Sequence, residues 1–230
     1  FIFMNAVGSA GDVRTMLHEA GHAFHAFESN HLPYPDQRHS GHEFSEVASM
    51  AMELLASPYL TSEFGGFYDS HEEAARHRAN HLRKIITFWP YMAVVDAFQH
   101  WVYKGDDEAM DPDACDAKWA ELWRRFMPAI DWTGYEDVMM TGWHRKQHIF
   151  RAPFYYVEYG MAQVGAIQVW RNVLEDRKAG LAQYRHALTQ GGTKSLHDLY
   201  ALAGANFKFD SNSMAEVVTL LEAKIEEQMA

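Results

Sequence analysis

The chain has 230 residues, 48% of them hydrophobic, and its 20 basic and 31 acidic side chains give a net charge of −11. At about 150 residues per domain, this length corresponds to one large domain or two small ones, and it is enough to bury a substantial core without disulfides. The excess of acidic side chains argues against nucleic acid as a partner, because binding phosphates requires clustered cationic side chains.

The numbers of cysteines and histidines indicate a cellular compartment and the type of ligand that a bound metal would have. The single cysteine, Cys115, cannot form an internal disulfide, which indicates a reducing compartment and, by default, the cytoplasm. No apolar run approaches the roughly 20 residues that span a bilayer, so we expect no membrane partner. With 14 histidines and one cysteine, a bound metal would be held by nitrogen and oxygen ligands rather than by thiolates.

The first 56 residues are predicted to hold a strand and two helices. Residues 1–7 are rich in β-forming side chains and end at two glycines, which predicts a short strand that either pairs with a substrate backbone or closes a small sheet. Asp12 is predicted to cap a first helix that continues to about residue 29. A loop with two prolines separates it from a second helix over residues 43–56.

The rest of the chain is predicted to be helical between loops. Residues 70–103 form a long amphipathic stretch interrupted only by Pro90, and its first part, residues 71–84, holds the one cluster of cationic side chains. Acidic neighbours and helical spacing favour a solvated, salt-bridged helix face there. A further helical segment covers residues 114–127.

Capping signals mark the last helices. Pro153 is predicted to open a helix at its first turn. Ser195 with Asp198, and Ser213 with Glu216, resemble capping boxes before the final two helices. The sequence therefore predicts one mainly α domain over residues 1–230, with a small β element at the amino terminus.

A histidine pair in the first helix has the spacing of a metal site. His18-Glu19-Ala20-Gly21-His22 places two imidazoles one above the other on a single helical face, where both can reach one ion at about 2.0 to 2.1 Å. Glu19 projects about 100° around the helix, beside the ion, where its carboxylate can hold a metal-bound water. An amphipathic helix with solvated histidines is the alternative interpretation.

The second helix offers the third ligand that an open zinc site needs. Glu46 would complete a set of two histidines and one carboxylate. Glu53 lies two turns further along the same face, where it is either a support for the second nitrogen of a histidine or a surface carboxylate. His25, one turn beyond His22, is expected to be a core or supporting histidine with its hydrogen bonds satisfied.

Three segments together resemble a known family. TMLHEAGHAFH followed by FSEVASMAMELL resembles the catalytic core of the thimet oligopeptidase and oligoendopeptidase F family of zinc metallopeptidases. WHRKQHIFRAPFYYVEYGMAQVGAIQVW resembles the segment that brings a histidine and several tyrosines over the metal in oligoendopeptidase F-like enzymes. The resemblance covers nearly the whole chain but only the carboxyl-terminal portion of the family protein. It implies a zincin-like helical catalytic domain whose substrate channel is completed by an amino-terminal region not included here.

The resemblance also implies roles for particular residues. His18, His22 and Glu46 would bind one zinc ion per chain, and Glu19 would be the catalytic carboxylate that takes a proton from the zinc-bound water. The late segment supplies candidates for contacting the substrate and the oxyanion, of which Tyr159 aligns best; the set is His148, Tyr155, Tyr156 and Tyr159. The residues Ala152-Pro153-Phe154 depart from the family pattern, which leaves the choice between Tyr155 and Tyr156 open. Ordinary half-buried aromatic residues are the alternative for all three tyrosines.

The predicted function is a zinc-dependent metalloendopeptidase that hydrolyses peptide bonds in short oligopeptides. One alternative is a helical di-iron or metal-storage protein, because Glu19 with His22 and Glu28 with His31 both have Glu-x-x-His spacing. Such proteins place the two motifs on facing helices, whereas here both lie on one helix. A catalytically silent metal-binding fragment is the other alternative.

Overall fold

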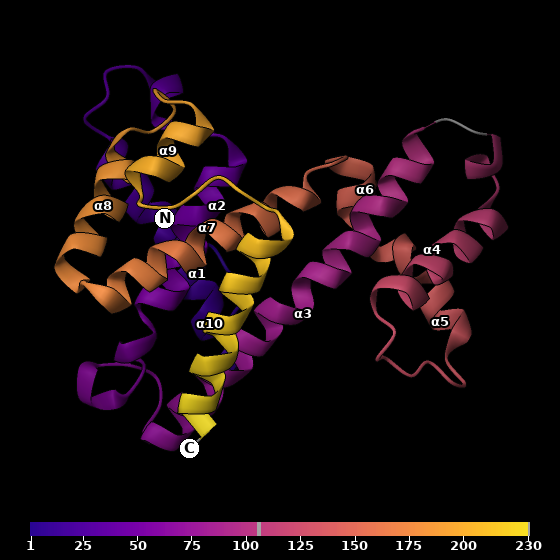
Figure 1. The fold of residues 1–230 in the computed structure, drawn as a ribbon, viewed down its shortest axis with the longest axis horizontal. Coiled ribbons are helices and arrows are strands. Elements are labelled where there is room, and N and C mark those ends of the chain that lie inside the picture. Colours follow the sequence, from indigo (N-terminus) through magenta and orange to yellow (C-terminus); the bar gives the residue numbers. More distant parts are fainter. Residues whose placement is uncertain (105–106, 230) are drawn as a thin grey trace. The chain divides into compact units, whose positions relative to one another are not determined.

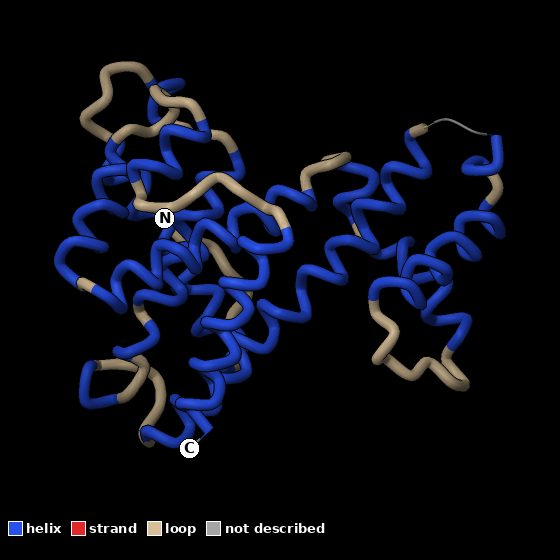
Figure 2. The backbone as a smooth tube through the Cα atoms, in the orientation of Figure 1, coloured by secondary structure: helices blue, strands red, loops and turns tan. Residues whose placement is uncertain are grey.

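Helices make up nearly all the regular structure in residues 1–104 and 107–229, which the computed structural model describes (Figure 1, Figure 2). The chain divides into two compact units, one formed by residues 1–84 and 161–230 and the other by residues 85–160. The mainly α class is confirmed. Whether the two units act as the single predicted domain stays a prediction.

The first unit contains the helices that carry the histidine pair and the third predicted ligand. Its helices are α1 (Ala10–Ser29), α2 (His42–Leu55), α8 (Arg177–Thr189), α9 (Leu196–Leu202) and α10 (Ser211–Met229), with the first part of α3 (His71–Tyr103) and most of α7 (Tyr156–Glu175). Three short 3-10 turns lie between α1 and α3, namely Pro35–Arg38, Ser57–Tyr59 and Ser62–Phe64.

The second unit is built around the remainder of α3. It also contains α4 (Pro112–Phe126), α5 (Glu136–Met140), α6 (Gln147–Arg151), the beginning of α7, and the 3-10 segments Asp107–Met110 and Thr141–Arg145. Helix α3 continues through Pro90, because its neighbours Trp89, Val94 and Val95 are buried and their packing offsets the lost backbone hydrogen bond.

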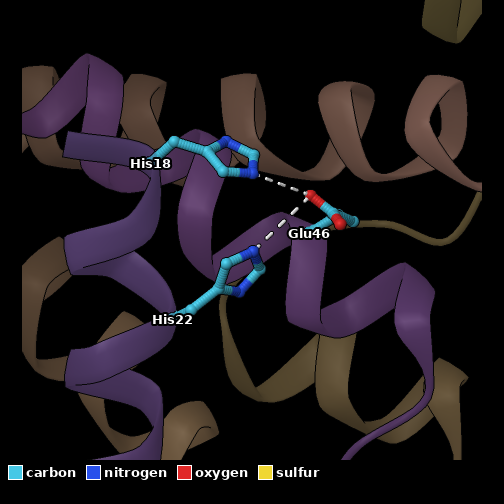
Figure 3. Close-up of side chains that lie close together, drawn as sticks. All are labelled: His18, His22 and Glu46. Carbon is cyan, nitrogen blue, oxygen red and sulfur yellow. Dashed lines mark ion pairs between the residues drawn. The ribbon is translucent and has the colours of Figure 1, made fainter. Parts of the chain in front are cut away.

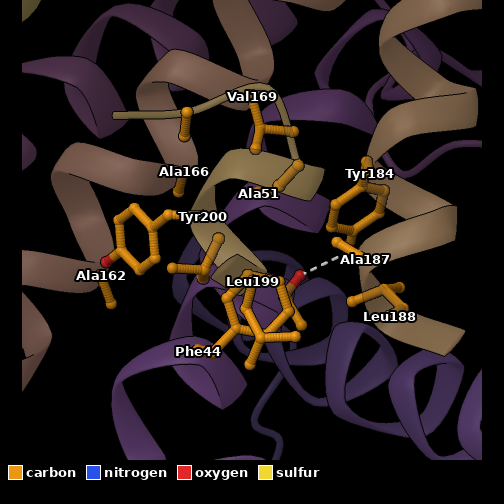
Figure 4. Packing of buried hydrophobic residues seen from close by; sticks show 14 residues of the cluster. Phe44, Ala51, Ala162, Ala166, Val169, Tyr184, Ala187, Leu188, Leu199 and Tyr200 are labelled. Carbon is orange, nitrogen blue, oxygen red and sulfur yellow. Dashed lines mark hydrogen bonds between the residues drawn. The ribbon is translucent and has the colours of Figure 1, made fainter. Parts of the chain in front are cut away.

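The core of the first unit fixes the position of α2 (Figure 4). Apolar residues of α2 recur at helical spacing and pack against α7, α8 and α9; they are Phe44, Val47, Ala48 and Ala51. The hydroxyl of Tyr184 donates a 2.7 Å hydrogen bond to the carbonyl oxygen of Ala48. With this face of α2 in the core, its polar residues Glu46, Ser49 and Glu53 lie on the side that meets α1.

The predicted strand over residues 1–7 is not formed, and the prediction of a small β element is wrong. Within the described ranges there is only an isolated parallel bridge, between Thr61 and Tyr68, so residues 1–7 have no strand with which to pair. Phe1 and Phe3 are exposed, and the backbone N–H of Val7 donates to the carboxylate of Asp12. High β propensity alone therefore does not determine the structure of this segment.

Two capping predictions need correction at the helix starts. Ser9, not Asp12, caps α1; its hydroxyl accepts from the N–H of Asp12, whose carboxylate accepts from the N–H of Ser9. At α10, the N–H of Ser213 donates to Asp210 instead of the serine acting as the cap. Ser195 does cap α9, as predicted: its hydroxyl accepts from the N–H of Asp198, and Asp198 accepts from that hydroxyl.

The helix expected to open at Pro153 begins later, at Tyr156. Phe154 has a φ of 64°, which lies outside the helical region, and its N–H donates to the side-chain oxygen of Gln99. Among the described residues, no helix has the length and apolar composition to cross a membrane.

Candidate active site

Helices α1 and α2 pack side by side and direct three potential ligands toward one point (Figure 3). His18 and His22 come from successive turns of α1, and Glu46 comes from α2. The Nε2 atoms of His18 and His22 lie 3.3 Å and 4.0 Å from Oε2 of Glu46. One ligand atom from each residue lies within 4.8 Å of the others, so two imidazole nitrogens and one carboxylate oxygen converge as predicted.

Gly21 allows this convergence, although sequence analysis gave it no role. A Cβ atom on Gly21 would lie 2.5 Å from Cα of Ser49 and 2.8 Å from the carbonyl oxygen of Ala48, both on α2. Real side chains do not approach a backbone so closely, so the two helices can be this near only with glycine at position 21. In the sequence, the glycine directly before His22 was the one feature that could have indicated this close helix packing.

Glu46 is held by its own helix. It is only 7% exposed, and the hydroxyl of the fully buried Ser49 donates a 3.1 Å hydrogen bond to its Oε2. The same hydroxyl lies 3.0 Å from the carbonyl oxygen of Glu46. A carboxylate fixed in this way is oriented before any ligand arrives.

The two histidines have opposite pKa shifts. Burial alone would lower the pKa of His18, but hydrogen bonds with Glu46 and Glu53 raise it to about 10. Burial lowers the pKa of His22, and the charges of Glu46 and Glu19 only partly oppose it. His22 is therefore ready to donate a lone pair at neutral pH, whereas a cation binding to His18 must displace a proton.

Glu53 occupies the supporting position that was one of its two predicted alternatives. Its Oε1 accepts a 2.8 Å hydrogen bond from Nδ1 of His18, which leaves Nε2 of that ring directed toward Glu46. Burial would raise the pKa of Glu53, but hydrogen bonds from His18 and His81 lower it to about 2. Glu53 is thus ionised, and a carboxylate behind a ligating histidine is a common arrangement at zinc sites.

The donor chemistry fits zinc. Two imidazole nitrogens and one carboxylate oxygen, with no thiolate, form the set found at hydrolytic zinc sites that keep one position open for water or substrate. Glu19 is half-buried on α1, adjacent in sequence to His18, and its negative charge acts on His22. The arrangement therefore offers three potential ligands with a separate carboxylate beside them.

The remaining predicted site residues gather in one aromatic cluster of the second unit. The ring of His148 lies 6.1 Å from Tyr155, 5.1 Å from Tyr156 and 5.8 Å from Tyr159 between centroids. Tyr159 also lies edge-on to Tyr155 at 4.8 Å. These four residues thus contact one another as a group within residues 85–160, and their catalytic roles stay predictions.

Tyr155 and Tyr156 differ in their surroundings. Tyr156 is buried, and its hydroxyl accepts a 3.2 Å hydrogen bond from Nζ of Lys146, a residue that sequence analysis did not single out. Burial and the neighbouring Tyr91 and Tyr159 raise the pKa of Tyr156, so its phenol stays protonated. Tyr155 and Tyr159 are half-buried.

Residues 71–84 combine an exposed helix face, as predicted, with a buried face that was not predicted. Glu72 and Arg76 do form an exposed i, i+4 pair. His81, in contrast, is 9% exposed and lies 3.0 Å from Glu53, and His77 hydrogen-bonds the hydroxyl of Tyr68. The apolar residues Ala74 and Leu82, at helical spacing in the sequence, could have predicted this buried face.

Other histidine predictions had mixed outcomes. His25 is buried as expected, but its Nε2 has no hydrogen-bond partner among the described residues. Glu28 pairs with Arg185, and His31 contacts the carbonyl oxygen of Glu28. Within the described ranges, His18, His22 and Glu46 are the one group of three potential metal ligands, which gives no support to a di-iron site.

Comparisons with known proteins cover most of the chain. The model of peptidase family M3 matches residues 1–218. The chain is 21% identical over 228 residues to the oligoendopeptidase F homolog of Borreliella burgdorferi, across 95% of this chain and 36% of the relative. It is 22% identical over 210 residues to oligopeptidase PepF of Bacillus subtilis, across 90% of this chain and 30% of the relative.

A solved structure gives the same assignment. PZ peptidase A with inhibitor 2 has a TM-score of 0.88 and 32% identity, and the match covers 99% of this chain and 39% of that one. The chain spans about a third of the length of the curated relatives it matches, at 36% and 30%. On the match over residues 1–218, the chain belongs to peptidase family M3.

Proposed function

We propose that the protein is a zinc-dependent metalloendopeptidase that hydrolyses peptide bonds in short oligopeptides. The observation that carries the proposal is the convergence of His18, His22 and Glu46 within 4.8 Å in a chain of peptidase family M3. In the proposal these three residues hold one zinc ion per chain. When bound, zinc polarises a substrate carbonyl and lowers the pKa of a water to about 7.

Glu19 acts as the general base. Its carboxylate accepts a proton from the water that attacks the peptide carbonyl carbon, and then delivers that proton to the nitrogen of the leaving amine as the C–N bond breaks. A residue next to a ligand on the same helix suits this role, since Glu19 is not one of the three converging ligands and yet its charge reaches His22.

The aromatic cluster supplies hydrogen-bond donors to the substrate. The hydroxyl of Tyr159 donates to the carbonyl oxygen as negative charge develops on it, and His148 contacts the same part of the substrate. Between the other two tyrosines, we favour Tyr155 as the substrate contact, because it is half-buried whereas Tyr156 is buried.

The substrates, the rest of the substrate channel and the cellular location remain predictions. The resemblance to oligoendopeptidase F implies short peptides as substrates and a further region of the same protein that completes the channel. The cytoplasm is proposed as the location, in keeping with Cys115 as a buried free thiol.

Metal analysis with two substrates tests the proposal. We expect purified protein to bind one zinc per chain and to cleave a short quenched fluorescent peptide faster than a folded protein that contains the same peptide sequence. Zinc binding without any peptide cleavage would instead identify a catalytically silent fragment. Two iron atoms per chain would point to the di-iron alternative.

A further inference from the structure

The carboxylate of Glu53 lies between histidines from two different helices. Its Oε1 is 2.8 Å from Nδ1 of His18 on α1, and its Oε2 is 3.0 Å from Nε2 of His81 on α3. The side chains of Glu53 and His81 are each 10% exposed, so water competes little for either hydrogen bond. All three residues belong to the first unit.

Two hydrogen bonds fix the orientation of the Glu53 carboxylate, which a single one would not do. The terminal torsion of a glutamate is soft, so a single hydrogen bond at Oε1 would leave the carboxylate plane free to rotate. A second donor at Oε2 fixes that plane and keeps Oε1 directed at Nδ1 of His18. The ring of His18 is then held in the tautomer that carries its proton on Nδ1, with Nε2 facing Glu46.

His81 is the main second anchor. Arg14 also approaches Oε2 of Glu53, but its Nε stands 3.8 Å away and its side chain is 33% exposed. An ion pair at that distance and exposure contributes little. The shorter and more buried contact from His81 therefore determines the orientation of the carboxylate.

The same helix provides a matched control. His77 lies one turn before His81 on α3, and its Nδ1 is 2.6 Å from the hydroxyl of Tyr68. In the described part of the chain, His77 hydrogen-bonds Tyr68 and not Glu53 or the three converging ligands, although it lines the same cavity as His81 and Glu53, of about 320 Å³. Replacing His77 disturbs α3 without touching the link to His18.

We propose that His81 is a positioning residue for the metal centre, acting through Glu53 to orient His18 and so to raise the affinity for a divalent metal. The inference rests on the proposed zinc site, but it does not depend on peptide hydrolysis. It extends the site from two helices to three, because α3 becomes part of what holds the ligand in place.

Zinc affinity, measured by competition with a chromophoric chelator on the full chain, tests this proposal. We expect His81→Leu to weaken zinc binding by about 10- to 100-fold, as loss of an outer hydrogen bond does at other sites. His81→Gln should stay within about threefold of wild type, since its amide nitrogen reaches the position of Nε2. His77→Leu should lower the unfolding temperature but leave zinc affinity within about threefold of wild type.

A second variant, His81→Asn, keeps the test valid if His81→Leu does not fold. His81→Asn keeps the polar group but stops one bond short of Glu53, so it should lose zinc affinity as His81→Leu does. In a Glu53→Ala background, His81→Leu should cause little further loss, because the residue through which it acts is gone.

Several results would overturn the proposal. Wild-type zinc affinity in both His81→Leu and His81→Asn would do so, as would an equal loss in His77→Leu or an undiminished effect in the Glu53→Ala background. Failure of the proposed function would look different. A wild-type chain that binds zinc and does not cleave peptides would still show the predicted order of affinities among these variants.

Discussion

A side chain at Gly21 would collide with Ser49, because a Cβ built on Gly21 stands 2.5 Å from the Cα of Ser49. Gly21→Ala must therefore push α1 away from α2 and separate the histidines from Glu46. We expect it to destabilise the fold by about 1 to 3 kcal/mol and to weaken zinc binding at least tenfold. Denaturant unfolding and chelator competition measure the two effects.

The control for this substitution lies on the same helix. Gly11→Ala places a Cβ no closer than 3.4 Å to the side chain of Ser9, so it should leave zinc affinity unchanged and stabilise α1 by up to about 1 kcal/mol. Equal zinc affinity in Gly21→Ala and wild type would show that close helix packing does not govern the site.

Tyr159→Phe tests the donor to the developing oxyanion. Since the hydroxyl matters most when charge builds on the carbonyl oxygen, kcat should fall by about 10²- to 10³-fold while KM changes by less than about threefold. Tyr135→Phe, at an exposed tyrosine of the same unit, should have wild-type kinetics. An unchanged kcat in Tyr159→Phe would mean that another tyrosine has this role.

Acid should destabilise the metal-free protein through His25. Burial, followed by the charges of His22 and His39, lowers the pKa of His25 from 6.5 to about 4. Between these values the unfolded chain binds the proton more readily, so the free energy of unfolding falls as the pH decreases. The contribution lost between pH 7 and pH 5 is about 2 kcal/mol.

Urea unfolding at pH 7, 6 and 5 measures this effect. His25→Phe removes the titrating group and keeps an aromatic ring against Phe44, so its free energy of unfolding should depend less steeply on pH than that of wild type. Substituting the exposed His31 with Ala should not change the slope. Parallel pH profiles for wild type and His25→Phe would contradict the assignment.

Metal removal should lower thermal stability. A ligand present at 100 times its dissociation constant stabilises the native state by about 2.7 kcal/mol, so a chelator should reduce the Tm and added zinc should restore it. His22→Ala should abolish this zinc-dependent shift, whereas His31→Ala should retain it. A zinc-dependent shift of wild-type size in His22→Ala would exclude His22 as a ligand.

Local patterns in the sequence were the most reliable guide to the site. His18 and His22 lie on one face because four residues make about one helical turn, whatever surrounds the helix. The supporting role of Glu53 could not be decided from sequence, since it depends on how α2 meets α1. His81 was missed because its burial arises only when α3 packs near Glu53.

Elements whose structure depends on a distant partner were predicted less well. Residues 1–7 have β propensity but lack a neighbouring strand in the described part of the chain, and Ser213 was outcompeted by Asp210 as a cap. The convergence of His148 with the tyrosines was anticipated only through the family resemblance. Their contacts involve α6 and α7, which no local pattern relates to each other.

Glu19→Gln tests the central claim most directly, because it deletes the proposed base and leaves His18, His22 and Glu46 intact. Zinc content and peptide hydrolysis should be measured on the same preparation, with Glu28→Gln on the same helix as the control. We predict one zinc per chain with hydrolysis reduced by about 10²- to 10⁴-fold in Glu19→Gln, and wild-type behaviour in Glu28→Gln. Full peptidase activity in zinc-loaded Glu19→Gln would contradict the mechanism.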